Sequence, residues 1–172
     1  HILPDGTKEE LWLAEEEEMR KEKKKKEEKE REEQEYNRYT YEEMAGDELE
    51  QFVWKIFKRR KCKVELSPKL DRDGVDLLVE DPMTNTRIGI QCKNQGNRLD
   101  DEKVQRYTAN IDMHELDTMI IICTGDFYHD AEYFKRKELV FWNRNRLEEE
   151  SRKEGMSWQA VIDEWKNSKS QK

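Results

Sequence analysis

The chain has 172 residues, of which 43% are charged and 34% hydrophobic, and its formal net charge is −8. This length suits one compact domain with extensions. Residues 1–44 hold 10 Lys and Arg against 16 Asp and Glu, whereas residues 45–147 hold 18 against 19. An acidic chain does not attract polyanions by its bulk charge, so nucleic-acid binding requires a local basic face. No apolar run reaches the ~20 residues of a membrane helix, so we expect no membrane partner.

The cysteines and histidines form no recognisable metal or disulfide pattern. Cys62, Cys92 and Cys123 stand singly beside or inside apolar runs, and an odd number of cysteines does not suit a disulfide framework. The three histidines have no zinc-site spacing. We therefore expect buried thiols in a reducing intracellular compartment, and the sequence does not distinguish nucleus, cytoplasm or organelle.

Residues 1–44 form a charged extension, in which residues 9–43 are predicted to be one long helix. This stretch contains no Gly or Pro, and acidic and basic side chains recur four residues apart, as in Glu16 with Arg20 and Glu17 with Lys21. No apolar heptad runs through it, so a coiled coil is not expected. A disordered charged tail is the alternative. Leu11 and Trp12 are candidates for docking a protein partner.

Residues 45–147 carry the pattern of an α/β domain. In the helix predicted at 48–60, the apolar side chains recur at helical spacing and mark a core-facing stripe; they are Leu49, Phe52, Val53, Ile56 and Phe57. Strands are predicted at 63–66, 75–80, 86–92, 118–123 and 139–142, with helices at 99–113 and 131–136. Three strands followed by crossover helices predict a mixed β-sheet flanked by helices on both faces.

Residues 148–172 form a helical C-terminal tail. One helix is predicted at 146–153 and a last one at 158–166, and Gly155 separates the two. Trp158, Val161, Ile162 and Trp165 fall on one face of the last helix. Together with Leu11 and Trp12, we take Trp158 and Trp165 as partner-docking candidates.

Two short motifs carry the chemical information. Asp73-Gly74-Val75-Asp76 precedes one strand, and Gln91-Cys92-Lys93 ends the next. With an acid on the preceding helix, the stretch from Gly46 to about Leu147 resembles the Mrr-type restriction endonuclease domain of the PD-(D/E)XK nuclease superfamily, in its Q-x-K variant. The resemblance implies a restriction-endonuclease-like α/β fold and four catalytic residues, Glu50, Asp76, Gln91 and Lys93. The second glycine often found before the hydrophobic residue is absent here.

The same residues have a physical logic of their own. Side chains alternate along a strand, so Gln91 and Lys93 share one face and Cys92 points away. The Asp76 carboxylate, the Gln91 amide and the Cys92 backbone carbonyl are hard oxygen donors suited to Mg²⁺ or Mn²⁺. Such an ion activates water toward a phosphodiester, and Lys93 can orient or deprotonate that water. Taken singly, each residue is commonplace at a turn or strand end; their joint order favours a nuclease site.

A basic run at the end of the first predicted helix is the candidate nucleic-acid surface. It consists of Lys58, Arg59, Arg60, Lys61 and Lys63, with Lys69 and Arg72 nearby. The alternative is a solvated helix end, because cations favour helix C-termini.

These features together predict a metal-dependent endonuclease that hydrolyses DNA. A structural or adaptor subunit of a larger assembly, built on a nuclease fold, is the alternative, and a dimeric junction resolvase is a third hypothesis with the same fold. The sequence leaves open DNA against RNA, sequence or modification specificity, and oligomeric state. No sequence-reading helix is evident, so specificity is expected to depend on a partner or another domain.

Overall fold

The computed structural model describes residues 7–42, 44, 47–66 and 74–170. The chain divides into two compact units, His1–Tyr36 and Asn37–Lys172. Lys69 and Arg72 of the predicted basic surface lie outside the described residues. In the described part of the chain, no helix combines the length and the apolar character that a membrane span requires.

The N-terminal extension is helical, as predicted. Helix α1, Thr7–Glu42, has 36 residues, which corresponds to about 54 Å at 1.5 Å per residue. Ion pairs one turn apart join Glu16 to Arg20 and Glu17 to Lys21, at 3.5 and 3.9 Å. Such pairs add ~0.2–0.5 kcal/mol each to a helix, so several of them can sustain a helix that has almost no apolar face.

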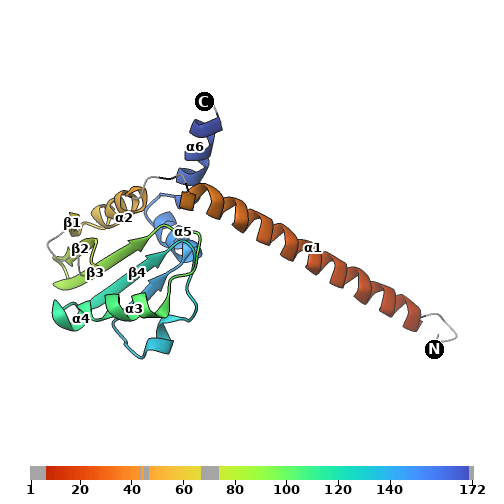
Figure 1. Ribbon diagram of the computed structural model, residues 1–172, viewed down its shortest axis with the longest axis horizontal. Coiled ribbons are helices and arrows are strands. Elements are labelled where there is room, and N and C mark those ends of the chain that lie inside the picture. The colour runs from red at the N-terminus through yellow and green to blue at the C-terminus, as the bar shows by residue number, and fades with distance from the viewer. Residues whose placement is uncertain (1–6, 43, 45–46, 67–73, 171–172) are drawn as a thin grey trace. The chain divides into compact units, whose positions relative to one another are not determined.

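The second unit contains the predicted mixed sheet, with five strands in the order β1-β2-β3-β4-β5 (Figure 1). They are β1 Lys63–Leu66, β2 Leu77–Asp81, β3 Thr86–Lys93, β4 Thr118–Cys123 and β5 Leu139–Trp142. β1, β2 and β3 pair antiparallel, whereas β3, β4 and β5 pair parallel. The carboxyl ends of β3, β4 and β5 therefore meet at one edge of the sheet, where α/β proteins commonly place their sites.

Helices cover both faces of this sheet (Figure 1). One face carries α2 Glu48–Arg59, α5 Arg144–Arg152 and α6 Trp158–Ser170; the other carries α3 Asp101–Thr108 and α4 Asn110–Met113. All five residues of the predicted stripe of α2 are buried. The ring of Phe57 stacks on Trp142 of β5, and that of Phe52 packs edge-on against Trp158 of α6.

Two predicted helices differ from the structure. The helix expected at 99–113 is divided after Thr108, where the buried Asn110 donates from its side chain to the Tyr107 carbonyl at 3.0 Å. That bond satisfies a backbone group at the break, which propensity alone does not reveal. The helix expected at 131–136 is a single 3-10 turn, η2 Ala131–Phe134, which ends because Lys135 adopts a left-handed backbone with φ 54°.

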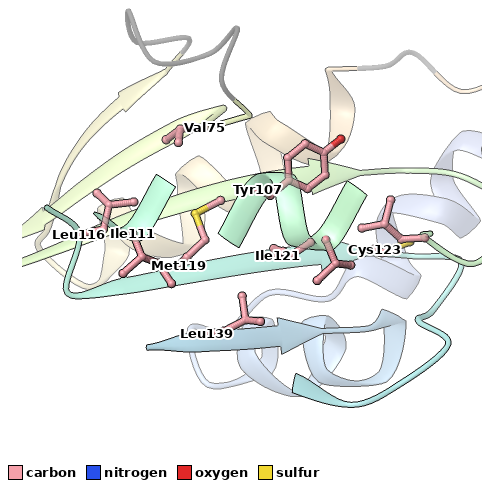
Figure 2. Packing of buried hydrophobic residues seen from close by; sticks show 10 residues of the cluster. Val75, Tyr107, Ile111, Leu116, Met119, Ile121, Cys123 and Leu139 are labelled. Atoms are coloured by element: carbon pink, nitrogen blue, oxygen red, sulfur yellow. The ribbon is translucent and has the colours of Figure 1, made fainter. Parts of the chain in front are cut away.

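One hydrophobic core lies between the sheet and α3–α4 (Figure 2). Met119, Ile121 and Cys123 alternate along β4 toward this face, and Val104, Tyr107 and Ile111 face them from the helices. Fully burying one such side chain is worth about 1.5–3 kcal/mol. This packing fixes the β3–β4 edge relative to α3, and so positions the residues that follow β3.

Trp158 is a core residue, which corrects its prediction as a docking side chain. Its exposure is 1%, and its indole lies against Phe52. The helical spacing of Trp158 and Ile162 marks the buried face of α6, since Ile162 is also fully buried. An indole enclosed in this way is not accessible to a partner.

Candidate active site

Gly74, Val75 and Asp76 of the first motif lead into β2, and Asp73 lies outside the described residues. Gly74 has φ +94°, and a Cβ added there would lie 2.8 Å from Cε1 of Tyr107. Only glycine avoids both the backbone strain and the contact with the ring. Val75 is fully buried in the core below. The glycine and the valine together bring Asp76 to the start of the strand.

Asp76 is buried and bonded to β3. Its exposure is 8%, its N–H donates to the Ile90 carbonyl at 2.8 Å, and its Oδ2 accepts the N–H of Cys92, also at 2.8 Å. The carboxylate thus takes the place of a backbone acceptor where the antiparallel ladder ends. A carboxylate has about four lone-pair positions, so this bond does not exhaust its capacity to bind.

Gln91 presents a buried oxygen without a hydrogen-bond donor. The side chain is 5% exposed, and its Nε2 donates to the Cys92 carbonyl at 3.4 Å. Among the described residues, its Oε1 finds no hydrogen-bond partner. This oxygen faces Gly74, at 3.4 Å from the position that a Cβ would take. An unsatisfied buried acceptor costs about 1–3 kcal/mol, so its retention calls for an explanation.

Lys93 lies on the same strand face as Gln91, as the alternation predicted. Its Nζ lies 5.8 Å from the centre of the Tyr107 ring. Tyr107 of α3 therefore contacts both motifs, because the same ring covers Gly74. Tyr107 lies in the helix predicted at 99–113, and no local signal in the sequence indicates its position between the two motifs.

Glu50 approaches the motif from the other face of the sheet. It is half-buried in the first turn of α2. Burial, and after it the negative charges of Asp76 and Glu50, raise the pKa of the Cys92 thiol well above its ordinary value. Both carboxylates therefore act electrostatically on Cys92, which places Glu50 near the end of β3, while Cys92 itself stays a neutral, inert thiol.

No three His, Cys, Asp or Glu side chains of the described residues gather into a cluster that could hold a metal. The predicted donor set is of a different kind. It comprises one carboxylate, one side-chain amide and one backbone carbonyl, from Asp76, Gln91 and Cys92. The first two are buried beside each other on paired strands, and the third accepts the Gln91 amide.

The predicted basic surface is mostly exposed, and one of its members is held within the fold. Arg60 binds Glu150 and Glu154 at 3.2 and 2.9 Å, and the exposed Arg59 donates to the Glu154 carbonyl at 2.6 Å. These residues end α2, about 14 Å along the helix axis from Glu50. Lys58, Lys61 and Lys63 are exposed, and Lys58 lies over Trp54, at 5.8 Å. These side chains stay candidates for contact with nucleic acid.

The remaining docking candidates differ in exposure. Leu11 and Trp12 of α1 are each 60% exposed. Trp165 is half-buried and borders a groove of about 360 Å³ between α2 and α6. These three side chains stay candidates for contact with a partner.

Comparison with known protein families identifies the family of this chain. A family model of restriction endonucleases, the Mrr catalytic domain, matches residues 41–150. That span exceeds half of the chain. The chain belongs to this Mrr-type restriction endonuclease family. The match contains Glu50, Asp76, Gln91 and Lys93, and it agrees closely with the stretch that the motifs delimited. Searches of curated proteins and of solved structures found no match to the chain. Membership of the Mrr family supports the prediction that the chain is a nuclease.

Proposed function

We propose that the chain is a divalent-metal-dependent endonuclease that hydrolyses DNA phosphodiester bonds, with Asp76, Gln91 and Lys93 at its centre. The observation that carries the proposal is the buried Gln91 Oε1, to which no described residue donates a hydrogen bond. A donor-free oxygen beside a carboxylate is the environment that a hard cation satisfies. The family's membership in a class of metal-dependent nucleases supports the same assignment.

The donors fit Mg²⁺ or Mn²⁺. Gln91 can rotate its amide by half a turn, which exchanges Oε1 and Nε2. Its oxygen would then stand beside the Cys92 carbonyl that Nε2 now contacts. Two neighbouring oxygens repel each other unless a cation lies near them. With Asp76 they form an oxygen-only set of modest charge, suited to an ion that keeps several waters.

When bound, such an ion lowers the pKa of a coordinated water and offsets the charge that develops on the phosphate. Lys93 supplies the positive charge on the protein side. Its ammonium lies over the Tyr107 ring, 5.8 Å from the ring centre, which restrains a side chain that is otherwise flexible. From there the ammonium can stabilise the phosphate, whereas only the neutral amine form of Lys93 could accept a proton from the attacking water. Glu50 adds negative charge from α2 and positions a water or Lys93.

Plasmid nicking tests this function. The full chain should nick supercoiled DNA with Mg²⁺ or Mn²⁺ and not with EDTA. Asp76→Asn and Lys93→Ala should each lower the rate by at least ~10²-fold, as expected when a charge-stabilising group is removed. Lys24→Ala, an exposed lysine of α1 outside both motifs and the predicted basic surface, is the matched control and should nick normally. Equal nicking rates for wild type, the two site variants and the control variant would contradict the proposal.

A structural or adaptor role is the second candidate. Exposed Leu11, Trp12 and Leu13 on a highly charged helix favour it, because contiguous exposed apolar side chains commonly mark contact surfaces. On this account the chain resides in a larger particle and the nuclease site is idle. Sedimentation of the native protein, compared with Trp12→Ala, separates the two. A particle that depends on Trp12, together with absent nicking, would favour the adaptor.

A further inference from the structure

A cavity of about 1030 Å³ lies beside β5, in the unit that carries the nuclease site. Aromatic side chains line it: Phe127, Tyr128, His129 and Phe141. The rings of Phe127 and Phe141 stack in parallel at 4.1 Å. His129 is backed by Tyr133 at 3.8 Å, also in parallel. Tyr128 is 56% exposed. Flat rings with accessible faces are the surfaces on which nucleobases stack.

Cationic side chains stand at the rim of this cavity. Four border it, Lys135, Arg136, Lys137 and Arg146, together with three acids, Asp126, Asp130 and Glu132. Two of the acids accept backbone hydrogen bonds: Asp126 accepts the N–H of Phe127, and Asp130 accepts that of Tyr133. Arg136 pairs with carboxylates of α4 and of the residue before β5, and Arg146 pairs with one of α5. Lys135 and Lys137 are exposed and have no ion pair within the described residues, so they are the cations that can contact a phosphate.

The cavity is connected to the nuclease site through neighbouring chain segments. The loop after β4 is tied to the segment after Lys93, because the N–H of Thr124 donates to the Lys93 carbonyl at 3.1 Å. Farther along, Leu99 bridges Phe127, and Asp101 pairs with His129 at 2.9 Å. Tyr128 also borders a second cavity of about 350 Å³, which contains Gln95, Arg98 and Lys103 as well as the acid Asp100.

The cavity lies two strands away from Lys93. Neighbouring strands are about 4.8 Å apart, so β5 lies roughly 10 Å from β3 across the sheet. The aromatic residues 127–129 follow β4, at the edge where β3 also ends, whereas Lys135 and Lys137 precede β5, at its opposite end. Because a stacked strand rises about 3.4 Å per nucleotide, a nucleic acid that reaches both Lys93 and the cavity must span several nucleotides.

We propose that this cavity binds an unpaired nucleotide of the substrate, so that the chain prefers DNA with a single-stranded segment next to the cleaved bond. The inference rests on the proposed function, and it names the class of substrate. Tyr128 supplies the stacking surface at the mouth of the cavity. Lys137 and Lys135 neutralise the adjoining phosphates. A duplex without an unpaired base does not expose the π-face that this site takes.

Binding of DNA oligonucleotides to the full chain tests the inference. A duplex with a short single-stranded tail carrying 2-aminopurine is compared with the blunt duplex, both on Asp76→Asn protein in EDTA, so that cleavage plays no part. We expect tighter binding of the tailed duplex and quenching of 2-aminopurine. Tyr128→Ala should weaken tailed binding roughly fivefold to a hundredfold, the range for losing one stacked base, and Tyr128→Phe should restore it.

Charge variants provide the second readout. Lys137→Gln should lower the slope of log affinity against log salt by about 0.7, the value for one phosphate contact to a single strand. Lys24→Gln, an exposed lysine of α1 that belongs to neither the cavity nor the predicted basic surface, should leave the slope unchanged. Equal binding of blunt and tailed DNA would overturn the inference, and so would quenching of 2-aminopurine by Tyr128→Ala to the same extent as by wild type. In that case the edge strand β5 would be available to pair with a strand of a protein partner instead. These binding measurements do not depend on cleavage. A failure of the inference can therefore be distinguished from a failure of the nuclease proposal, which the nicking assay tests.

Discussion

Gly74 and Tyr107 set the geometry of the motif turn at the level of single residues. Gly74→Ala introduces a side chain at φ +94° and within 3 Å of a buried ring. Strain and overpacking should together lower the free energy of unfolding by at least about 2 kcal/mol. Urea unfolding measures this change.

A second glycine provides the matched control for that substitution. Gly155 also has positive φ, at +71°, but a Cβ there would meet nothing nearer than 3.7 Å. Gly155→Ala should therefore cost only the backbone strain, about 1 kcal/mol. If Gly74→Ala costs no more than Gly155→Ala, the Tyr107 ring does not constrain the turn.

Gln91 offers a test of cation binding that does not require cleavage. Gln91→Glu adds a buried carboxylate next to Asp76, so the variant should melt at a lower temperature than wild type without divalent ions. Mg²⁺ should raise its melting temperature more than that of wild type, because binding to the folded state stabilises by mass action. Thermal unfolding with and without Mg²⁺ measures both effects.

The isosteric Gln91→Met removes the donor oxygen and serves as control. Its melting temperature should not respond to Mg²⁺. An equal Mg²⁺ response in wild type, Gln91→Glu and Gln91→Met would show that the ion binds elsewhere or not at all.

At this scale, the sequence predicts the motif residues better than their surroundings. Asp76, Gln91 and Lys93 follow from order and alternation, because a strand fixes which side chains share a face. The position of Tyr107 does not, because its ring contacts Gly74, which lies far earlier in the chain. The ion pairs of Arg60 were not predictable for the same reason, since its partners Glu150 and Glu154 lie about 90 residues later.

Among the elements, the junction of α2 with α5 depends on Glu150. Arg60, Arg146 and Lys153 all bind this carboxylate, at 3.2, 3.2 and 2.6 Å. Burial raises the pKa of Glu150, but the hydrogen bonds from Lys153 and Arg60 outweigh it and leave the pKa below its ordinary value. A depressed carboxyl pKa stabilises the fold above the unfolded pKa of ~4.3 and ceases to do so as pH falls through the folded pKa.

Glu150→Gln should therefore reduce stability at neutral pH by about 1–3 kcal/mol, the range for a charged hydrogen bond. The difference from wild type should be constant above about pH 6 and should shrink below about pH 4, where Glu150 itself becomes protonated. Denaturant unfolding over this pH range gives the difference. If the difference in the free energy of unfolding between wild type and Glu150→Gln grew as the pH fell, the pKa of Glu150 could not be lowered in the folded state.

Elements with a strong period were predictable, whereas short connecting ones were not. The stripe of α2 and the apolar run of β4 agree with the structure, since each is long enough to display its period. The 3-10 turn η2 and the break between α3 and α4 depend on local hydrogen bonds and on one left-handed residue, Lys135. Neither has a periodic signal.

For the whole molecule, the extension and the nuclease domain should be separable in stability. The buried apolar side chains of the described residues run from Met44 to Ile162, all in the second unit. Deleting residues 1–36 should therefore change the melting temperature by less than about 2 °C, because it removes no core contact. Calorimetry of the shortened chain measures this. A loss of cooperative unfolding would mean that α1 belongs to the folded core.

The fold class and the family could be predicted at this scale because family motifs and hydrophobic pattern agree. The cavity beside β5 could not, because its walls come from segments separated by up to twenty residues and from both ends of β5. Which cationic face meets nucleic acid was likewise hidden. Composition reports the number of charges and says nothing of which ones the fold pairs with carboxylates.

The central claim is that Asp76, Gln91 and the Cys92 carbonyl hold a divalent cation. Anomalous scattering from crystals of the full chain soaked in Mn²⁺ tests it most directly. We predict one strong peak about 2.0–2.2 Å from the Gln91 and Cys92 oxygens and from the Asp76 carboxylate. A peak that lies elsewhere, with Gln91 Oε1 still lacking a partner, would contradict the account.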